Sequence, residues 1–264
     1  MAFAKKSLGQ NFLISPGIVE RIAQAGDIQK GETVIEIGPG KGVLTAALLR
    51  AGAKVKAIEK DDRLIGFLDE LFRAETARGD FELFHDDVME MTPEKLSARI
   101  PEAYKVIANI PYYITGQIIR LFLSMPHKPA NMVLMVQKEV ANRIIARDEK
   151  ESILSLSVKA YAKPELVVSV ARGNFFPIPN VDSAVIKLSD IQNPFTDARE
   201  EERFFEIVKA GFGQKRKKLI RNLEAVTDRE SLARAFAVLQ IGENARAEDI
   251  SLPTWIRLAH ELAQ

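Results

Sequence analysis

Glycines and acidic residues follow three apolar segments of the sequence, at the positions where the segments end. They are Gly38, Gly40 and Gly42 in IEIGPGKG, Glu59 at the end of KVKAIE, and Asp86 and Asp87 at the end of FELFHDD. Glycines let a backbone approach a ligand closely, and a carboxylate can accept hydrogen bonds from ribose hydroxyls or from an adenine amino group. The pattern predicts a site for a cofactor that contains adenosine.

Two other ligands fit parts of this pattern. NAD is a weaker candidate, because the dinucleotide-binding fingerprint G-x-G-x-x-G needs a third glycine where this chain has Val43. The pair Asp86 and Asp87 could instead hold Mg²⁺. The chain has no cysteine, and its three histidines are far apart in the sequence. We therefore expect no histidine or thiolate metal site and no metal cofactor.

A fourth apolar segment, VIA, ends in the sequence NIPYY. The Asn109 side-chain oxygen and the backbone carbonyl of Ile110 or Pro111 are hydrogen-bond acceptors, and a nucleobase can stack on Tyr112. If the cofactor is S-adenosylmethionine, these acceptors can hold an adenine amino group in line with the activated methyl group. The amine loses a proton to water after methylation, so the site needs no strong general base. Taken alone, the motif favours a simpler interpretation, a turn in which Asn109 caps a helix and the tyrosines pack.

Alternating strand-length and helix-length segments must position these residues. We expect strands at residues 33–38, 54–59, 81–87, 105–110 and 131–137, separated by helices in the order typical of a parallel sheet. Segments 165–170 and 183–188 lack a helix-length connection, which predicts an antiparallel pair at the edge of the sheet. Ligands of such sheets bind at the carboxyl ends of the strands, so the segments described above should border one crevice.

The character of the sequence changes near residue 193, after which helical patterns continue to the C-terminus. We therefore expect one domain at residues 1–192 and a small helical domain at residues 193–264. Apolar residues make up 47% of the chain, enough for a substantial core. No apolar run has transmembrane length, and the first residues lack the apolar core of a signal peptide, so we expect a cytoplasmic protein.

A basic segment near the C-terminus indicates contact with nucleic acid. The formal net charge of the chain is only +1, so such a contact has to come from a local cluster. The segment GQKRKKLIRN holds no acidic residue and contains Lys215, Arg216, Lys217, Lys218 and Arg221. We expect this basic cluster to bind phosphates without reading sequence. Lys5 and Lys6, and Arg143 and Arg147, could extend the contact.

Several segments together resemble the ribosomal RNA adenine N6-dimethyltransferases, a family that dimethylates two adjacent adenosines near the 3′ end of small-subunit rRNA. The segments are KKSLGQNFL, IEIGPGKG, IEKD, NIPY, LMVQKEVANRI, FFPIPNVDSAVIKL and GFGQKRKKLIRNL, which extend over nearly the whole chain. The resemblance implies a Rossmann-like class I methyltransferase fold of the α/β class. This fold has a mostly parallel sheet with an antiparallel edge strand, a small C-terminal all-helical domain, and S-adenosylmethionine as cofactor.

The resemblance also implies roles for individual residues. Those that contact the cofactor would be Asn11, Leu13, Gly38, Gly40, Glu59, Asp87 and Asn109. Asp87 is preferred to Asp86 because HDDVM aligns with the acid that precedes a small residue and Met in the family. An aromatic residue, Phe175 or as second choice Phe176, would close over the face of the target base opposite Tyr112.

Two alternative functions share these features. Methyltransferases of the erythromycin-resistance type modify one adenosine of large-subunit rRNA and share QNF and NIPY, but PNVDSAV and QKRKKLIRNL favour the small-subunit branch. A non-catalytic assembly or transcription factor could keep the same fold, but the intact glycine turn, Glu59 and Asn109 argue against it. We expect a monomer that acts on small-subunit rRNA in the precursor 30S particle, without a membrane or metal partner.

Overall fold

The computed structural model describes residues 11–262, which divide into two compact units. Within this range, the first unit comprises the residues up to Ala141 together with Ala162–Ile191. The second unit comprises Asn142–Tyr161 together with the residues from Gln192 onward. No helix in the described range has the length and apolar character needed to cross a membrane.

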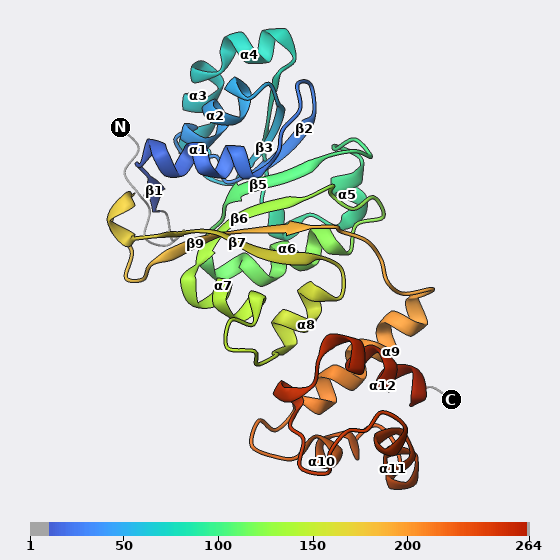
Figure 1. The fold of residues 1–264 in the computed structure, drawn as a ribbon. Helices are drawn as coiled ribbons and strands as arrows, with labels where there is room; N and C mark the ends of the chain where they lie inside the picture. The colour runs from blue at the N-terminus through green and yellow to red at the C-terminus, as the bar shows by residue number, and fades with distance from the viewer. Residues whose placement is uncertain (1–10, 263–264) are drawn as a thin grey trace. The chain divides into compact units, whose positions relative to one another are not determined.

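A seven-stranded sheet forms the centre of the first unit (Figure 1). In spatial order its strands are β4 (Phe81–His85), β3 (Lys54–Glu59), β2 (Thr33–Ile37), β5 (Lys105–Asn109), β6 (Met132–Gln137), β9 (Ser183–Ser189) and β7 (Lys163–Val170). The strands from β4 to β6 are parallel, and β9 runs antiparallel to both of its neighbours. The predicted fold class is therefore confirmed, including the antiparallel pair at one edge.

Helices connect the parallel strands and cover both faces of the sheet. They are α1 (Pro16–Ala25), α2 (Val43–Arg50), α3 (Asp62–Leu71), α4 (Arg73–Arg78), η2 (Val88–Glu90), α5 (Pro93–Ser97), η3 (Tyr112–Ile114), α6 (Thr115–Leu123) and η4 (Arg172–Asn174). Figure 1 shows α1, α2 and α3 on one face and α6 on the other. A parallel sheet covered on both faces needs apolar residues at successive positions, and residues 132–136 of β6 are indeed fully buried.

A two-stranded ribbon lies outside the main sheet of the first unit. Its strands are β1 (Phe12–Leu13) and β8 (Phe175–Phe176), which pair antiparallel. Phe12 is opposite Phe176, and Leu13 is opposite Phe175. Because neighbouring residues of a strand point to opposite sides, Phe175 is buried at 1% exposure whereas Phe176 is 66% exposed.

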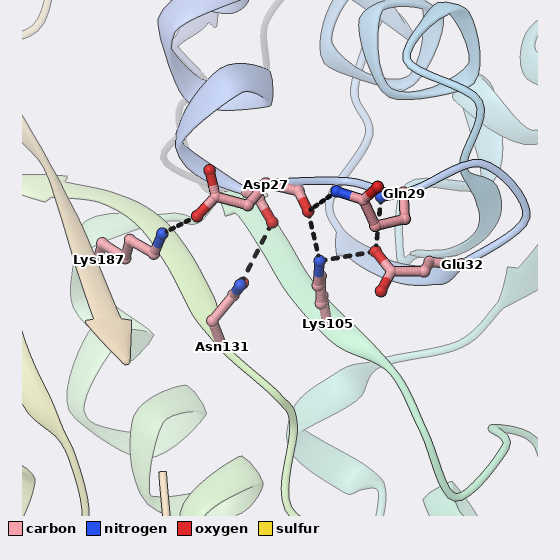
Figure 2. A network of polar contacts seen from close by, with 7 residues as sticks. Asp27, Gln29, Glu32, Lys105, Asn131 and Lys187 are labelled. Carbon is pink, nitrogen blue, oxygen red and sulfur yellow. Dashed lines mark hydrogen bonds and ion pairs between the residues drawn. The ribbon is translucent and has the colours of Figure 1, made fainter. Parts of the chain in front are cut away.

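Polar contacts join the loop after α1 to the amino-end edge of the sheet (Figure 2). Lys105 is only 7% exposed, and its Nζ donates to the Asp27 carbonyl at 2.7 Å and to Glu32 Oε2 at 2.6 Å. Lys187 pairs with the Asp27 carboxylate, and Asn131 Nδ2 donates to the carbonyl of Gly26 at 3.2 Å. A buried cation is tolerated when it is paired in this way, so the network holds β5, β6 and β9 against the loop.

The second unit is helical and is built around aromatic side chains. Its elements are α8 (Ile153–Lys159), α9 (Ala198–Gly211), α10 (Leu219–Leu223), α11 (Arg229–Val238), η5 (Ala247–Asp249) and α12 (Leu252–Glu261), and α7 (Lys138–Ile145) crosses the boundary between the units. Trp255 is fully buried and stacks on Phe212 with ring centroids 5.8 Å apart.

The boundary between the units differs from the predicted one in one respect. The prediction placed residues 142–161 in the first domain, whereas the structure groups them with the C-terminal helices. The reason is packing: α8 contacts α9, and the ring of Tyr161 lies against those of Phe195 and Phe205, at centroid distances of 5.8 and 6.2 Å. A helix that follows a strand in sequence does not have to cover that strand.

The Lys105 network predicts a loss of stability when its central cation is removed. Lys105→Met leaves the Asp27 carbonyl and the Glu32 carboxylate without this donor, so the free energy of unfolding in urea should fall by about 1–3 kcal/mol. Lys187→Met is the control, because its partner Asp27 is exposed, and it should cost less than about 1 kcal/mol.

Lys105→Met should also alter how the free energy of unfolding depends on pH. The pKa of Glu32 is lowered by the backbone N–H of Gln29 and then by Lys105, so its carboxylate stabilises the fold above the pKa of the unfolded chain. This contribution is lost as the pH falls through the lowered pKa. If the free energy of unfolding falls equally with pH in Lys105→Met and in the parent protein, Lys105 does not lower the pKa of Glu32 and the proposed network is wrong.

Candidate active site

A cavity of about 490 Å³ lies at the carboxyl ends of the parallel strands of the first unit. Its lining contains residues from each of the four segments that the sequence analysis singled out: Gly38 and Gly40 after β2, Glu59 at the end of β3, Asp86 and Asp87 after β4, and Asn109, Pro111 and Tyr112 at the end of β5 and beyond. Asn11 and Leu13 line it as well. The fold thus brings together segments that are far apart in the sequence.

A side chain at Gly40 would be strained by the backbone conformation and packed tightly against Phe12. This residue has a φ of +60°, and a Cβ placed on it would lie 3.2 Å from the ring of Phe12. Its N–H donates to Glu59 Oε2 at 3.1 Å. Lys41 Nζ lies 4.9 Å from the centre of the same Phe12 ring. The turn is therefore held between β1 and Glu59, and at Gly38 and Gly40 it presents only backbone to the cavity.

Glu59 is buried at 6% exposure where the turn and β3 meet. Besides the bond from Gly40, its Oε1 accepts the N–H of Asp61 at 2.8 Å. Burial raises the pKa of Glu59, although these backbone donors oppose the shift. Each carboxylate oxygen accepts one backbone hydrogen bond and has a further lone pair, so the group can accept the two hydroxyls of a ribose.

Asp86 and Asp87 both line the cavity, and each is paired with a cation. Asp86 pairs with Arg99 at 2.7 Å, and Asp87 pairs with Lys60 and accepts the N–H of Met89 at 3.0 Å. Burial alone would raise the pKa of Asp87, but the hydrogen bond from Lys60, the N–H of Met89 and the charge of Lys60 together outweigh it, so the pKa is lowered.

This pairing disfavours Mg²⁺, because both carboxylates already have cationic partners. No cluster of three or more potential metal ligands occurs between residues 11 and 262. The choice between Asp86 and Asp87 as the adenine contact stays open, since both reach the cavity.

The residues after β5 present hydrogen-bond acceptors at the cavity. The Asn109 side chain lines it and has no hydrogen-bond partner among the described residues. The Pro111 carbonyl accepts the N–H of Ile114 at 3.2 Å, whereas the carbonyl of Ile110 accepts none from that part of the chain. Pro111 lines the cavity and its carbonyl keeps a second lone pair, whereas Ile110 is 1% exposed and is not among the lining residues. The choice between the two backbone carbonyls therefore stays open.

Tyr112 lines the same cavity next to these acceptors. Its hydroxyl lies 2.7 Å from Ser183 Oγ, and Thr115 Oγ1 donates to its carbonyl at 3.1 Å. Burial raises the pKa of the Tyr112 phenol, while the bond with Ser183 opposes the shift. The hydroxyl keeps its proton at neutral pH, and the ring stands beside Asn109 as an uncharged aromatic surface.

Phe175 and Phe176 are placed differently from what the resemblance implies. The cavity lining includes neither of them. Phe175 belongs to the hydrophobic core together with Leu13, so its ring would have to leave the core to cover a base. Phe176 is exposed and pairs with Phe12, which does line the cavity. The strand alternation that separates the two rings cannot be read from FF alone.

One acidic residue, Glu36, and two cations, Lys41 and Lys60, line the cavity although the sequence did not single them out. Glu36 is buried, and burial raises its pKa to about 8, although Thr45 Oγ1 donates to it at 2.6 Å and opposes the shift. An acid inside the apolar run VIEI was the available signal. Lys60 could not be found in this way, because its partner Asp87 lies on another strand.

The basic cluster belongs to the second unit. Lys215, Arg216, Lys217 and Lys218 are exposed before α10, without an ion-pair partner in the described range, and Arg221 pairs with Glu224 at 3.2 Å. Asn222 Nδ2 donates to the carbonyls of Gly211 and Gln214 at 2.6 and 3.1 Å, which holds the loop that carries the cluster. Arg143 and Arg147 belong to this unit as well, whereas Lys5 and Lys6 lie outside the described residues.

Comparison with known proteins assigns the chain to a family. The sequence model of the ribosomal RNA adenine dimethylases matches residues 1–264, the whole chain. The chain belongs to this family. The resemblance noted from the motifs is confirmed, and the protein is a methyltransferase of the class that uses S-adenosylmethionine.

Curated relatives of the dimethylase extend over nearly its full length. Ribosomal RNA small subunit methyltransferase A of Dehalococcoides mccartyi is 41% identical over 98% of this chain and 89% of its own. The protein of the same name from Geobacillus thermodenitrificans is 37% identical over 98% of this chain and 90% of its own.

Two solved structures share the whole architecture of the dimethylase. The 23S rRNA methyltransferase ErmE has a TM-score of 0.78 at 26% identity and covers 96% of this chain and 100% of its own. A dimethyladenosine transferase from Plasmodium falciparum has a TM-score of 0.77 at 26% identity, covering 94% of this chain and 95% of its own. The fold alone does not show which of these two proteins the chain resembles more, since the two TM-scores are nearly equal.

The position of Glu59 predicts a specific loss of cofactor affinity. Glu59→Gln removes the charge that would hold two ribose hydroxyls, so the dissociation constant for S-adenosylmethionine should rise about 10- to 100-fold in calorimetry. Affinity in the parent protein should also fall as the pH drops through the raised pKa of Glu59, and this acid dependence should weaken in the variant. Glu82→Gln on β4 is the control, because that exposed carboxylate pairs with Lys56 and lies outside the cavity.

Proposed function

We propose that this protein dimethylates the N6 amines of two adjacent adenosines near the 3′ end of small-subunit rRNA, with S-adenosylmethionine as methyl donor. The observation that carries the proposal is the Asn109 side chain, an acceptor without a hydrogen-bond partner among the described residues, beside a cavity that is also lined by a glycine turn and Glu59. The relatives named small subunit methyltransferase A support the choice of rRNA.

The cavity residues fit the cofactor that we propose. Backbone at Gly38 and Gly40 faces the space, Glu59 can accept ribose hydroxyls, and Asp87 can accept an adenine amino group. Asn11, Leu13 and Asn109 complete the proposed set, and all of them line the cavity. When bound, the cofactor supplies a methyl group activated by its sulfonium.

The chain's own residues would position the amine. The adenine amino group would donate its two N–H bonds to Asn109 Oδ1 and to the backbone carbonyl of Ile110 or Pro111, which favours the pyramidal nitrogen of the transition state. The methyl group that the cofactor supplies would bond to this nitrogen, and the extra proton of the methylated amine would then leave to water. Positioning and electrostatics carry such a reaction, and no general base has to be supplied.

Tyr112 would stack on the target base, which must be unpaired or leave its helix to enter. The resemblance assigns the other face of the base to Phe175, whose ring is in the core. Phe176 is the exposed neighbour. Both stay candidates for the second aromatic contact.

The small-subunit and large-subunit branches can be separated directly. ErmE and the P. falciparum transferase match the fold equally well, but the curated relatives at 37% and 41% identity bear the small-subunit name. We expect the purified protein to methylate precursor 30S particles and not protein-free 23S RNA. The reverse preference would establish the large-subunit alternative.

The remaining parts of the proposal follow from this substrate. The helical unit would bind rRNA through the basic cluster, and the partner would be a precursor 30S particle met by a monomer of this protein. The proposed compartment is the cytoplasm, because an enzyme that acts on assembling bacterial-type subunits works where they assemble.

The role of Asn109 predicts a defect in rate. Asn109→Ala removes one acceptor for the amine in the transition state, so kcat should fall about 100-fold while the thermal midpoint stays near that of the parent protein. Asn131→Ala deletes the same side chain at the opposite edge of the sheet and should lower stability without this loss of rate. Near-normal turnover by Asn109→Ala would refute the proposed role.

The basic cluster predicts a change in the salt dependence of RNA binding. Replacing Lys215, Arg216 and Lys218 by Gln should weaken binding and reduce the slope of log affinity against log salt, by roughly 0.7–0.9 for each phosphate that the protein no longer neutralises. A control with Lys30, Lys54 and Arg73 replaced by Gln changes the net charge equally, at exposed positions of the first unit. Equal slopes in the two triple variants would show that the cluster does not bind RNA.

A further inference from the structure

One hydrogen bond joins the aromatic residue of the NIPY motif to the PNVDSAV motif. The hydroxyls of Tyr112 and Ser183 lie 2.7 Å apart, although 71 residues separate them in the sequence. Ser183 is completely buried, at 0% exposure. The two motifs were recognised by resemblance, and neither composition nor spacing indicated that they touch.

Ser183 is held in place by its surroundings. It is the first residue of β9 and pairs with Gln137 of β6 on one side and with Val170 of β7 on the other. The preceding residue, Asp182, accepts the N–H of Lys138 through its carbonyl and the N–H of Arg172 through its carboxylate, both at 3.0 Å. The position of the Ser183 hydroxyl is therefore fixed by the pairing of β9 with its two neighbours.

Tyr112 is attached to the fold at both of its ends. Its backbone is held by Thr115, whose hydroxyl donates to the Tyr112 carbonyl, and by the bond between Ile114 and Pro111. Its far end is held by Ser183. A tyrosine ring turns about two side-chain bonds, and fixing its hydroxyl as well as its Cα restricts both of them. The ring then keeps one orientation in the wall of the cavity.

We propose that Ser183 is a positioning residue that fixes the Tyr112 ring in the orientation in which it stacks on the target adenine. The proposal rests on the proposed function, in which Tyr112 is the stacking surface. A ring that is already oriented does not lose rotational freedom when the base arrives, so more of the stacking energy is available to hold the amine in line. Ser183 itself touches neither substrate nor cofactor in this arrangement.

The test removes each hydroxyl separately and then both together. Ser183→Ala and Tyr112→Phe should each lower kcat about fivefold, corresponding to the loss of one hydrogen bond, with unchanged affinity for S-adenosylmethionine. The double variant should be no slower than either single variant, because the two changes break the same bond. With 2-aminopurine in place of the target adenosine, its fluorescence quenching on binding should decrease in all three variants, because stacking is less complete.

Tyr104→Phe is the matched control. Tyr104 is also buried, and its hydroxyl donates to the His127 carbonyl at 2.9 Å, outside the cavity. This variant loses a buried phenol hydrogen bond of the same kind, so its thermal midpoint should fall while kcat and quenching stay unchanged. If Ser183→Ala does not fold, Tyr112→Phe carries the test, since it breaks the bond from the partly exposed side.

Failure of this inference can be told apart from failure of the proposed function. Tyr112→Ala removes the ring itself, and a parental kcat in that variant would overturn the stacking role and the inference with it. A slow Tyr112→Ala together with parental kcat in Tyr112→Phe and Ser183→Ala would overturn the inference alone. Losses that add in the double variant would also overturn it, because independent effects do not report a shared bond.

Discussion

The site depends on parallel strands that end at the same level. Ile37 pairs with Ile58 and Glu59 pairs with His85, so the residues that follow β2, β3 and β4 emerge side by side at one edge. A slip of one residue in any pairing would turn every side chain of that strand to the other face. The Lys105 network secures β5, β6 and β9 at the opposite edge, and buried apolar residues along β6 secure the middle.

Both backbone and side chains line the cavity at that edge. The glycine turn contributes main-chain groups, whose positions the sheet determines. Glu59, Asn109 and Tyr112 contribute side chains, and Glu59 and Tyr112 are each tied by a hydrogen bond to another part of the chain. The Asn109 amide is the exception, since the described chain leaves it without a partner. In the proposed function, this amide is the group that accepts a hydrogen bond from the substrate.

Local pattern predicted the parts of this structure that depend on neighbours in the sequence. The strand at residues 54–59 has the predicted bounds, and the acids at strand ends reach the cavity together with Gly38 and Gly40, whereas Gly42 is not among the lining residues. Contacts between distant segments could not be predicted in the same way. Lys60 meets Asp87 and Tyr112 meets Ser183 only after the sheet has formed. The grouping of residues 142–161 with the C-terminal helices is a third case, decided by aromatic packing.

Phe12 links the glycine turn to the aromatic ribbon of β1 and β8. A Cβ at position 40 would lie 3.2 Å from the ring of Phe12, whose backbone pairs with Phe176. A side chain introduced at position 40 would therefore press on β1 and, through the strand pairing, on β8. Such a substitution would disturb two walls of the cavity without a change in the main sheet.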